Sequence, residues 1–281
     1  KNMSWAWEEL VRLYDKLETE GRPICPVAHT YITAHIAVLI DKDGNFLAAM
    51  DPEVKGELVA VPCTAESETR TSGAAPHLIS DQLQYVAELK GHEKLHKEYI
   101  KQLANYVSKN PSDAYAYAVC KYVVNNNITD DIQEIIKRNK GIPEHKLNVV
   151  FGVYGINDTG SDLQWTEYYL NTLPKNGICS VTGVKDYIPS AYPACIMSQS
   201  GKEKLFMSGS QVGYIASQKV IHALQYLVYA AKNAERIEAE YKLHDLFDGK
   251  ISEPDFLQWV SNKYSGAEDG IMQILIAKEQ E

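Results

Sequence analysis

The stretch AHIAVLIDKDGNFLAAM, from Ala34 to Met50, decides how the first half of this chain folds. Residues Ala34 to Ile40 are apolar and rich in strand-forming side chains. The polar run Asp41 to Asn45 holds the Asp, Gly and Asn residues that favour a tight turn, and Phe46 to Met50 is apolar again. The stretch therefore predicts a β-hairpin.

A helix and a third strand are expected on either side of this hairpin. Ser4 can cap an N-terminal helix, because apolar side chains follow it at helical spacing. Leu58 to Pro62 predicts the third strand. We therefore expect a small antiparallel sheet packed on the N-terminal helix.

Residues 79–140 predict a helical insert. Polar caps and Gly or Pro breaks divide it into four segments with helical periodicity. The four helices are expected to start near Ser80, Gly91, Ser112 and Thr129.

The remaining segments complete an α+β fold class with a C-terminal helical segment. We expect strands at Lys146 to Tyr154 and Ile178 to Val181, and helices at Ser161 to Leu173 and Val212 to Leu246. The predicted organisation is one α+β domain over residues 1–240, followed by a helical tail of unknown role over residues 241–281.

Composition limits the classes of function. The 281 residues carry a formal net charge of −9, which argues against autonomous binding to nucleic acid, since that needs a basic face. No apolar run approaches the ~20 residues that span a bilayer, and the N-terminus lacks the apolar core of a signal peptide. The five cysteines are scattered, which favours reduced thiols. We therefore expect a cytoplasmic protein that makes no contact with a membrane.

One segment matches a metallohydrolase motif. His92, Glu93 and His96 fit H-E-x-x-H, in which two imidazoles four residues apart hold zinc and the glutamate polarises water. No third ligand follows at a recognised spacing, and the histidines also belong to an apolar helical stripe. Packing is therefore the preferred explanation, and a zinc hydrolase is a weaker alternative. We expect no metal, no cofactor and no enzymatic activity.

The strongest recognition candidate is the polar loop from Thr69 to His77. The guanidinium of Arg70 can form paired hydrogen bonds with a phosphate or a guanine edge. Thr71 and Ser72 offer short donors and acceptors, and Gly73 allows the backbone to approach a groove closely. An ordinary surface loop that caps the next helix is the alternative. Lys219, near the start of the long helix, is a weaker candidate for a DNA contact.

Three segments together resemble a known family. They are RTSGAAPHLISDQLQYV (70–86), GICSVTG (177–183) and VGYIASQKVIHALQYLV (212–228). Their order along the chain and their amino-acid sequences resemble the large subunit of the type I-C (Dvulg-subtype) CRISPR Cascade complex, over about residues 5–228. The resemblance implies a non-catalytic subunit that recognises the PAM in duplex DNA and helps to unwind the target. It also implies Cascade backbone subunits, guide RNA and duplex target DNA as partners.

The same resemblance implies which residues contact the PAM, and it also allows a second function. It places PAM contacts on Arg70, Thr71, Ser72 and Gly73, with Lys219 as the weaker candidate. Members of the family are longer and end in a helical bundle, so we expect a shortened relative that corresponds to the N-terminal portion. The alternative is a decoy: an anti-CRISPR-like inhibitor or regulator that mimics the large subunit.

Overall fold

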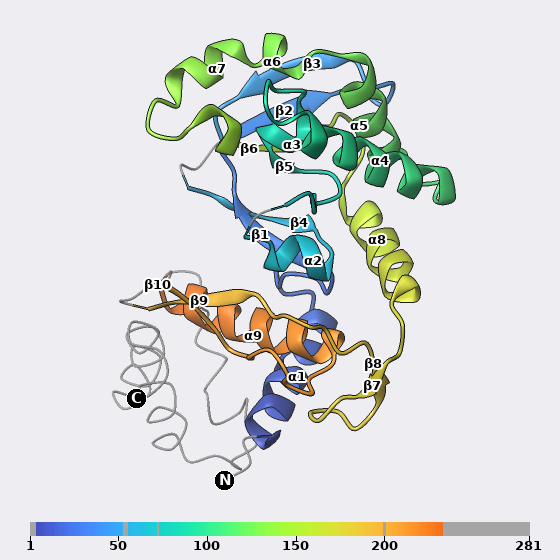
Figure 1. Cartoon of the computed structure of the whole chain (residues 1–281), viewed down its shortest axis with the longest axis vertical. Coiled ribbons are helices and arrows are strands. Elements are labelled where there is room, and N and C mark those ends of the chain that lie inside the picture. Colours follow the sequence, from blue (N-terminus) through green and yellow to red (C-terminus); the bar gives the residue numbers. More distant parts are fainter. Residues whose placement is uncertain (1–3, 53–55, 72, 199–200, 233–281) are drawn as a thin grey trace. The chain divides into compact units, whose positions relative to one another are not determined.

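The computed structural model describes residues 4–52, 56–71, 73–198 and 201–232 (Figure 1). The chain divides into two compact units: a central unit, Ala28–Leu173, and a terminal unit formed by Lys1–Val27 and Pro174–Glu281. Helices and small sheets occur in both, which confirms the α+β class. None of the described helices is long and apolar enough to cross a lipid bilayer.

The largest sheet lies in the central unit and has four strands (Figure 1). In spatial order they are β3 (Phe46–Met50), β2 (Ile36–Ile40), β6 (Asn148–Val153) and β5 (Asp81–Gln82). The antiparallel pairing of β2 with β3 confirms the predicted hairpin. The pairing of β2 with β6 is parallel, so this sheet is mixed.

The predicted third strand forms, but it has a different partner. β4 (Leu58–Pro62) pairs antiparallel with β1 (His29–Thr33) in a separate two-stranded sheet. The expectation that it would join the hairpin was wrong. Beside β2 lies β6 instead, which has alternate buried residues and comes from a segment about 110 residues later.

The turn of the hairpin is fixed by its own side chain and by a helix. The Oδ1 atom of Asp41 accepts hydrogen bonds from the backbone N–H groups of Asp43 and Asn45. Gly44 has a φ of +77°, and α5 (Ala114–Asn125) packs against it. A Cβ atom at Gly44 would lie 2.7 Å from Cβ of Lys121, so both the dihedral angle and the close approach require glycine.

The insert is helical, with boundaries that differ from those predicted. Where a helix from Ser80 was predicted, the chain forms strand β5 and one short helix. The helix predicted to start at Ser112 is α5, and its cap is Asp113, which accepts a hydrogen bond from the Ala116 N–H at 3.0 Å. Within the described residues the insert contains four other helices: α3 (Leu83–Val86), α4 (Glu93–Lys109), α6 (Ile128–Asp131) and α7 (Gln133–Arg138).

The described part of the central unit holds three further helices. They are α2 (Ala65–Thr69), the 3-10 helix η1 (Glu144–Lys146) and α8 (Thr159–Thr172), the last of which packs against β4 and α5.

Buried tyrosines tie the segments of the insert to one another and to strand β6. The Tyr99 hydroxyl donates to the Ile79 carbonyl at 2.7 Å, and the Tyr115 hydroxyl donates to the Phe151 carbonyl on β6. Tyr106 donates to the carboxylate of Asp113 at 2.7 Å. Each ring fills the core while its hydroxyl satisfies a polar atom that would otherwise be costly to bury.

The terminal unit is built around two helices. α1 (Ser4–Thr19) packs against α9 (Tyr214–Lys232), and the rings of Tyr14 and His222 lie 6.3 Å apart. The prediction for α1 named a sheet and missed this helical partner. The described residues of this unit also form the short strands β7 (Gly177–Ile178), β8 (Lys185–Asp186), β9 (Ala194–Ser198) and β10 (Gly201–Lys204). The remainder of the predicted long helix and the 241–281 tail lie outside the described residues.

We predict that Gly44→Ala destabilises the protein by about 3 kcal/mol, because it adds a collision with α5 to the cost of a left-handed alanine. The matched control is Gly155→Ala, at a φ of +78° with no atom within 4 Å of the added Cβ. That variant should lose only about 1 kcal/mol. Urea unfolding measures both, and equal losses would show that α5 does not constrain the turn.

Candidate nucleic-acid interface

The candidate recognition loop, residues 70–77, follows directly after α2 and is called the arginine loop below. α2 begins at a capping box in which Thr64 and Ser67 each accept a hydrogen bond from the other's backbone N–H, at 3.0 and 2.9 Å. The Tyr169 hydroxyl accepts from the N–H of Ala65 at 2.8 Å. Arg70 ends the helix in an extended conformation, so the start of the loop is fixed.

The guanidinium of Arg70 is directed into the protein. It forms a two-pronged ion pair with Asp81 on β5, with Nη1 2.7 Å from Oδ2 and Nη2 in contact with Oδ1. It also donates to the Ala75 carbonyl at 2.7 Å. The exposed fraction is 15% for the Arg70 side chain and 1% for that of Asp81. Burial lowers the pKa of Arg70, but the hydrogen bonds and charge of Asp81 outweigh burial and raise it overall.

Asp81 and Tyr85 hold the rest of the arginine loop. Besides the ion pair, Asp81 accepts from the backbone N–H groups of His77 and Gln82, both at 2.7 Å. The Tyr85 ring lies under the Arg70 guanidinium, 4.4 Å from its centroid, and its hydroxyl donates to the Gly73 carbonyl at 2.9 Å. Both ends of the loop are therefore tied to one carboxylate, and its middle is tied to one phenol.

His77 closes the loop as a buried neutral side chain. Its Nδ1 atom lies 2.9 Å from the Ser67 hydroxyl. Burial lowers the pKa of His77 to about 4, opposed by the charge of Asp81 and assisted by that of Arg70. An imidazole held this firmly belongs to the scaffold of the loop.

The four predicted loop residues do not share one environment in the structure. Arg70 faces inward, so the hypothesis of a direct contact between its guanidinium and DNA needs the ion pair with Asp81 to break; its observed role is to position the loop. Thr71 and Gly73 are exposed at the tip, and Gly73 has a φ of +100° with open space around it. Ser72 lies outside the described residues.

Lys219 lies in the terminal unit on α9. Its ammonium forms an ion pair with Asp15 of α1 and lies 5.4 Å from the centroid of the Tyr14 ring. The side chain is 21% exposed. The contact with Asp15 offsets part of the charge that a phosphate contact would use.

The histidines of the HEKLH segment each contact protein groups. His92 precedes α4 as its N-cap residue, and its ring stacks on that of His145 at 5.0 Å. Nδ1 of His96 lies 2.8 Å from the Tyr85 carbonyl, and Glu93 accepts from the N–H of Gly91. Across the described residues no group of three or more His, Cys, Asp or Glu side chains is placed to hold a metal ion.

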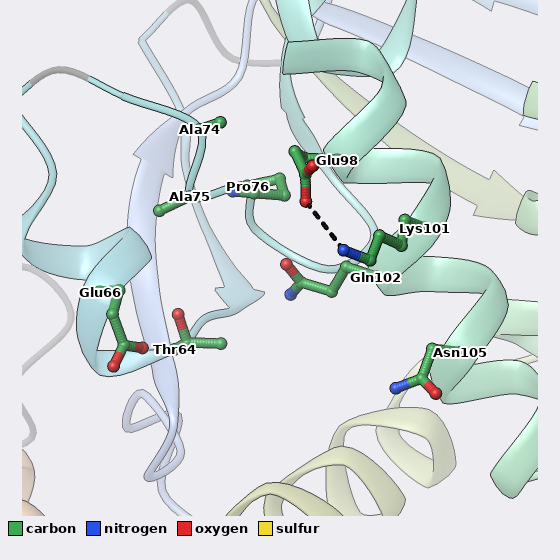
Figure 2. A pocket seen from close by; sticks show the side chains of 9 residues that line it. All are labelled: Thr64, Glu66, Ala74, Ala75, Pro76, Glu98, Lys101, Gln102 and Asn105. Atoms are coloured by element: carbon green, nitrogen blue, oxygen red, sulfur yellow. Dashed lines mark ion pairs between the residues drawn. The ribbon is translucent and has the colours of Figure 1, made fainter. Parts of the chain in front are cut away.

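A groove, called the α4 groove below, lies between the arginine loop and α4 (Figure 2). Its volume is about 540 Å³. The nine lining residues are Thr64, Glu66, Ala74, Ala75, Pro76, Glu98, Lys101, Gln102 and Asn105. Sequence reasoning missed the four residues from α4, because they follow the polar pattern of any solvent-facing helix and nothing local indicates that a loop faces them.

A comparison with known protein families matches a region that contains all three segments named in the sequence analysis. These segments belong to the kind of protein that acts in CRISPR defence: the family described as CRISPR-associated protein (Cas_Csd1) matches residues 10–241. The chain therefore belongs to the Cas_Csd1 family of CRISPR-associated proteins. No curated protein matches the chain.

We predict that breaking the ion pair of the arginine loop destabilises the protein. Asp81→Asn leaves the Arg70 cation without its partner and should cost about 3 kcal/mol of unfolding free energy. The double variant Arg70→Met/Asp81→Asn should be more stable than the sum of the two single losses predicts. Chemical unfolding of all four proteins gives the coupling energy, and strict additivity would contradict the pair.

The neutral state of His77 predicts a dependence of stability on pH. Its pKa is about 4 when folded and 6.5 in the reference state, so below pH 6.5 the unfolded chain binds the proton more readily. Stability should fall by about 1.5 kcal/mol between pH 6.5 and pH 5 through this residue alone. Comparing urea unfolding of the wild type and of His77→Gln at both pH values isolates this loss. Parallel profiles would rule out a neutral buried His77.

Proposed function

We propose that this chain is a non-catalytic subunit of a type I-C CRISPR surveillance complex, in which it recognises the PAM in duplex DNA and aids unwinding of the target. The supporting observation is the arginine loop: it lies within the region that matches the Cas_Csd1 family, and hydrogen bonds fix its ends and middle while its tip is exposed.

The hydrogen bonds that hold both ends of the loop and the Gly73 carbonyl support a role in recognition. A loop that is already ordered loses little conformational entropy when it binds. At the tip, Thr71 offers a hydroxyl, and Gly73 has no side chain to hold the backbone away from a groove. These groups suit recognition of groove width and of the few hydrogen-bond acceptors in a minor groove.

Charge determines how much of the binding this chain supplies. Affinity for duplex DNA comes largely from neutralising phosphates, and the chain carries a net charge of −9. Arg70 and Lys219 are both engaged in ion pairs. In this proposal the Cascade backbone subunits and the guide RNA hold the target, and this chain selects among sequences already bound. Cleavage belongs to a separately recruited nuclease.

Thr71→Glu should impair PAM recognition without unfolding the protein. It adds a negative charge at an exposed position that is proposed to face DNA, where repulsion should weaken target binding by roughly tenfold. The measurement is the dissociation constant of the reconstituted complex for a duplex target, at one stated salt concentration, with and without the PAM.

The matched control is Gln133→Glu, which adds the same charge at an exposed position on α7. It should leave the affinity for the target unchanged, and both variants should keep the thermal stability of the wild type. Equal affinity of the Thr71→Glu complex and the wild-type complex would refute the assigned contact. If instead excess chain blocks target binding by a complete complex, the protein is a decoy.

A further inference from the structure

The α4 groove combines an apolar wall with a polar one (Figure 2). Ala74, Ala75 and Pro76 of the arginine loop form the apolar side. Gln102 and Asn105 lie three residues apart, on the same face of α4, and form the carboxamide side. A volume of about 540 Å³ is in the range of small-molecule sites. A flat ring with polar edges fits such a lining.

The amide of Gln102 has an unmet hydrogen bond. Its Nε2 atom is buried and has no acceptor in the structure. A buried amide donor without a partner is costly, and the great majority of buried polar atoms are paired. The side chain extends toward the arginine loop (Figure 2), so a ligand in the groove could supply the missing acceptor after a rotation of the terminal amide.

The charges of the groove select the chemistry of that ligand. Glu66 and Glu98 contribute two carboxylates, and Lys101 contributes one ammonium, already 3.7 Å from Glu98. This balance disfavours a phosphate. It favours a neutral group that donates hydrogen bonds to carboxylates and both donates to and accepts from carboxamides. In nucleic acids the exocyclic amines of adenine and cytosine are such donors, and the usual partners are Asn or Gln for adenine and Glu or Asp for cytosine.

We propose that the α4 groove receives one unstacked, amino-bearing nucleobase of the target DNA, with Gln102 and Glu98 on its polar edge. This rests on the proposed function, because the arginine loop must first bring the duplex to the protein. Moving a base out of the stack costs a few kcal/mol, which contacts in the groove would offset. The groove would thereby help to open the first base pairs beside the PAM.

The test uses the complete complex with guide RNA and a duplex target. First, 2-aminopurine is placed as the stacking neighbour of each adenine or cytosine in and beside the PAM in turn, because its fluorescence rises when the neighbouring base leaves the stack, and the base under test keeps its amino group. Wild-type complex should give a rise at one position. Absence of a rise at every position overturns the proposal.

The second step tests the amino group itself. If the position found is an adenine, the affinity of the complex is compared between that target and one with the same purine lacking the amine; for a cytosine, the analogue lacks the 4-amino group. The wild type should prefer the amine by roughly tenfold. Gln102→Leu and Glu98→Gln should each reduce the preference to near unity. Because the preference is a ratio within one preparation, a change in the folded fraction cancels.

Lys94→Ala is the control, because Lys94 is exposed on α4 and does not line the groove. It should keep the full preference. A preference that persists in both groove variants overturns the proposal. So does a photo-crosslinker at Asn105 that captures a Cascade subunit and no DNA, since the occupant is then a polypeptide.

Stability gives an independent readout. Leu replaces Gln102 at similar volume and removes the unpaired donor, so the Tm of the isolated Gln102→Leu chain should stay equal or rise. If Gln102→Leu loses the preference for the amine while PAM-dependent binding stays normal, the groove recognises a base separately from the contact at Thr71. If Thr71→Glu has no effect on PAM-dependent binding, the proposed function itself fails, whatever the groove does.

Discussion

The carboxylate of Asp81 is the group on which the candidate interface depends. It sits on a two-residue strand at the edge of the main sheet and pairs with Arg70, eleven residues earlier. The same two oxygens accept the N–H groups of His77 and Gln82. One charged group thus joins the sheet to the loop, and the loop keeps its shape because a buried carboxylate is costly unless hydrogen-bond donors surround it.

The ion pair with Asp81 changes the role expected for an arginine in a polar loop. Under the proposed function, an exposed arginine would supply the contact with DNA itself; because Arg70 is paired, it holds the loop in shape, and the proposed contact falls to the exposed groups at the tip. Such a division fits an acidic chain. Selectivity between sequences requires a fixed shape in the right place, while affinity requires net positive charge that other molecules can provide. If selection among DNA sequences and affinity for DNA lie on different subunits, as proposed, each can be set independently.

The sequence predicted the parts of the fold that local chemistry determines. The hairpin at Ala34–Met50, α1 and α4 follow from periodicity and turn residues, and the exposed tip of the arginine loop follows from its polar, Gly-containing composition. The pairing of β4 with β1 did not follow, because the choice of partner depends on contacts distant in sequence. The ion pair of Arg70 could not be predicted either. Its partner, Asp81, lies beyond the other end of the loop, in a segment where Ser80 suggested a helix start and a short strand forms instead.

The same reasoning explains why the α4 groove escapes prediction. A helix that faced only solvent would leave Gln102 hydrated at no cost. In the structure the Nε2 atom is buried and has no acceptor, and the arginine loop, held by Asp81 and Tyr85, forms the facing wall of the groove. Packing alone would favour an apolar residue here. A polar group kept at a cost beside a preformed loop is typical of a binding surface, where stability is given up for interactions made only with a ligand.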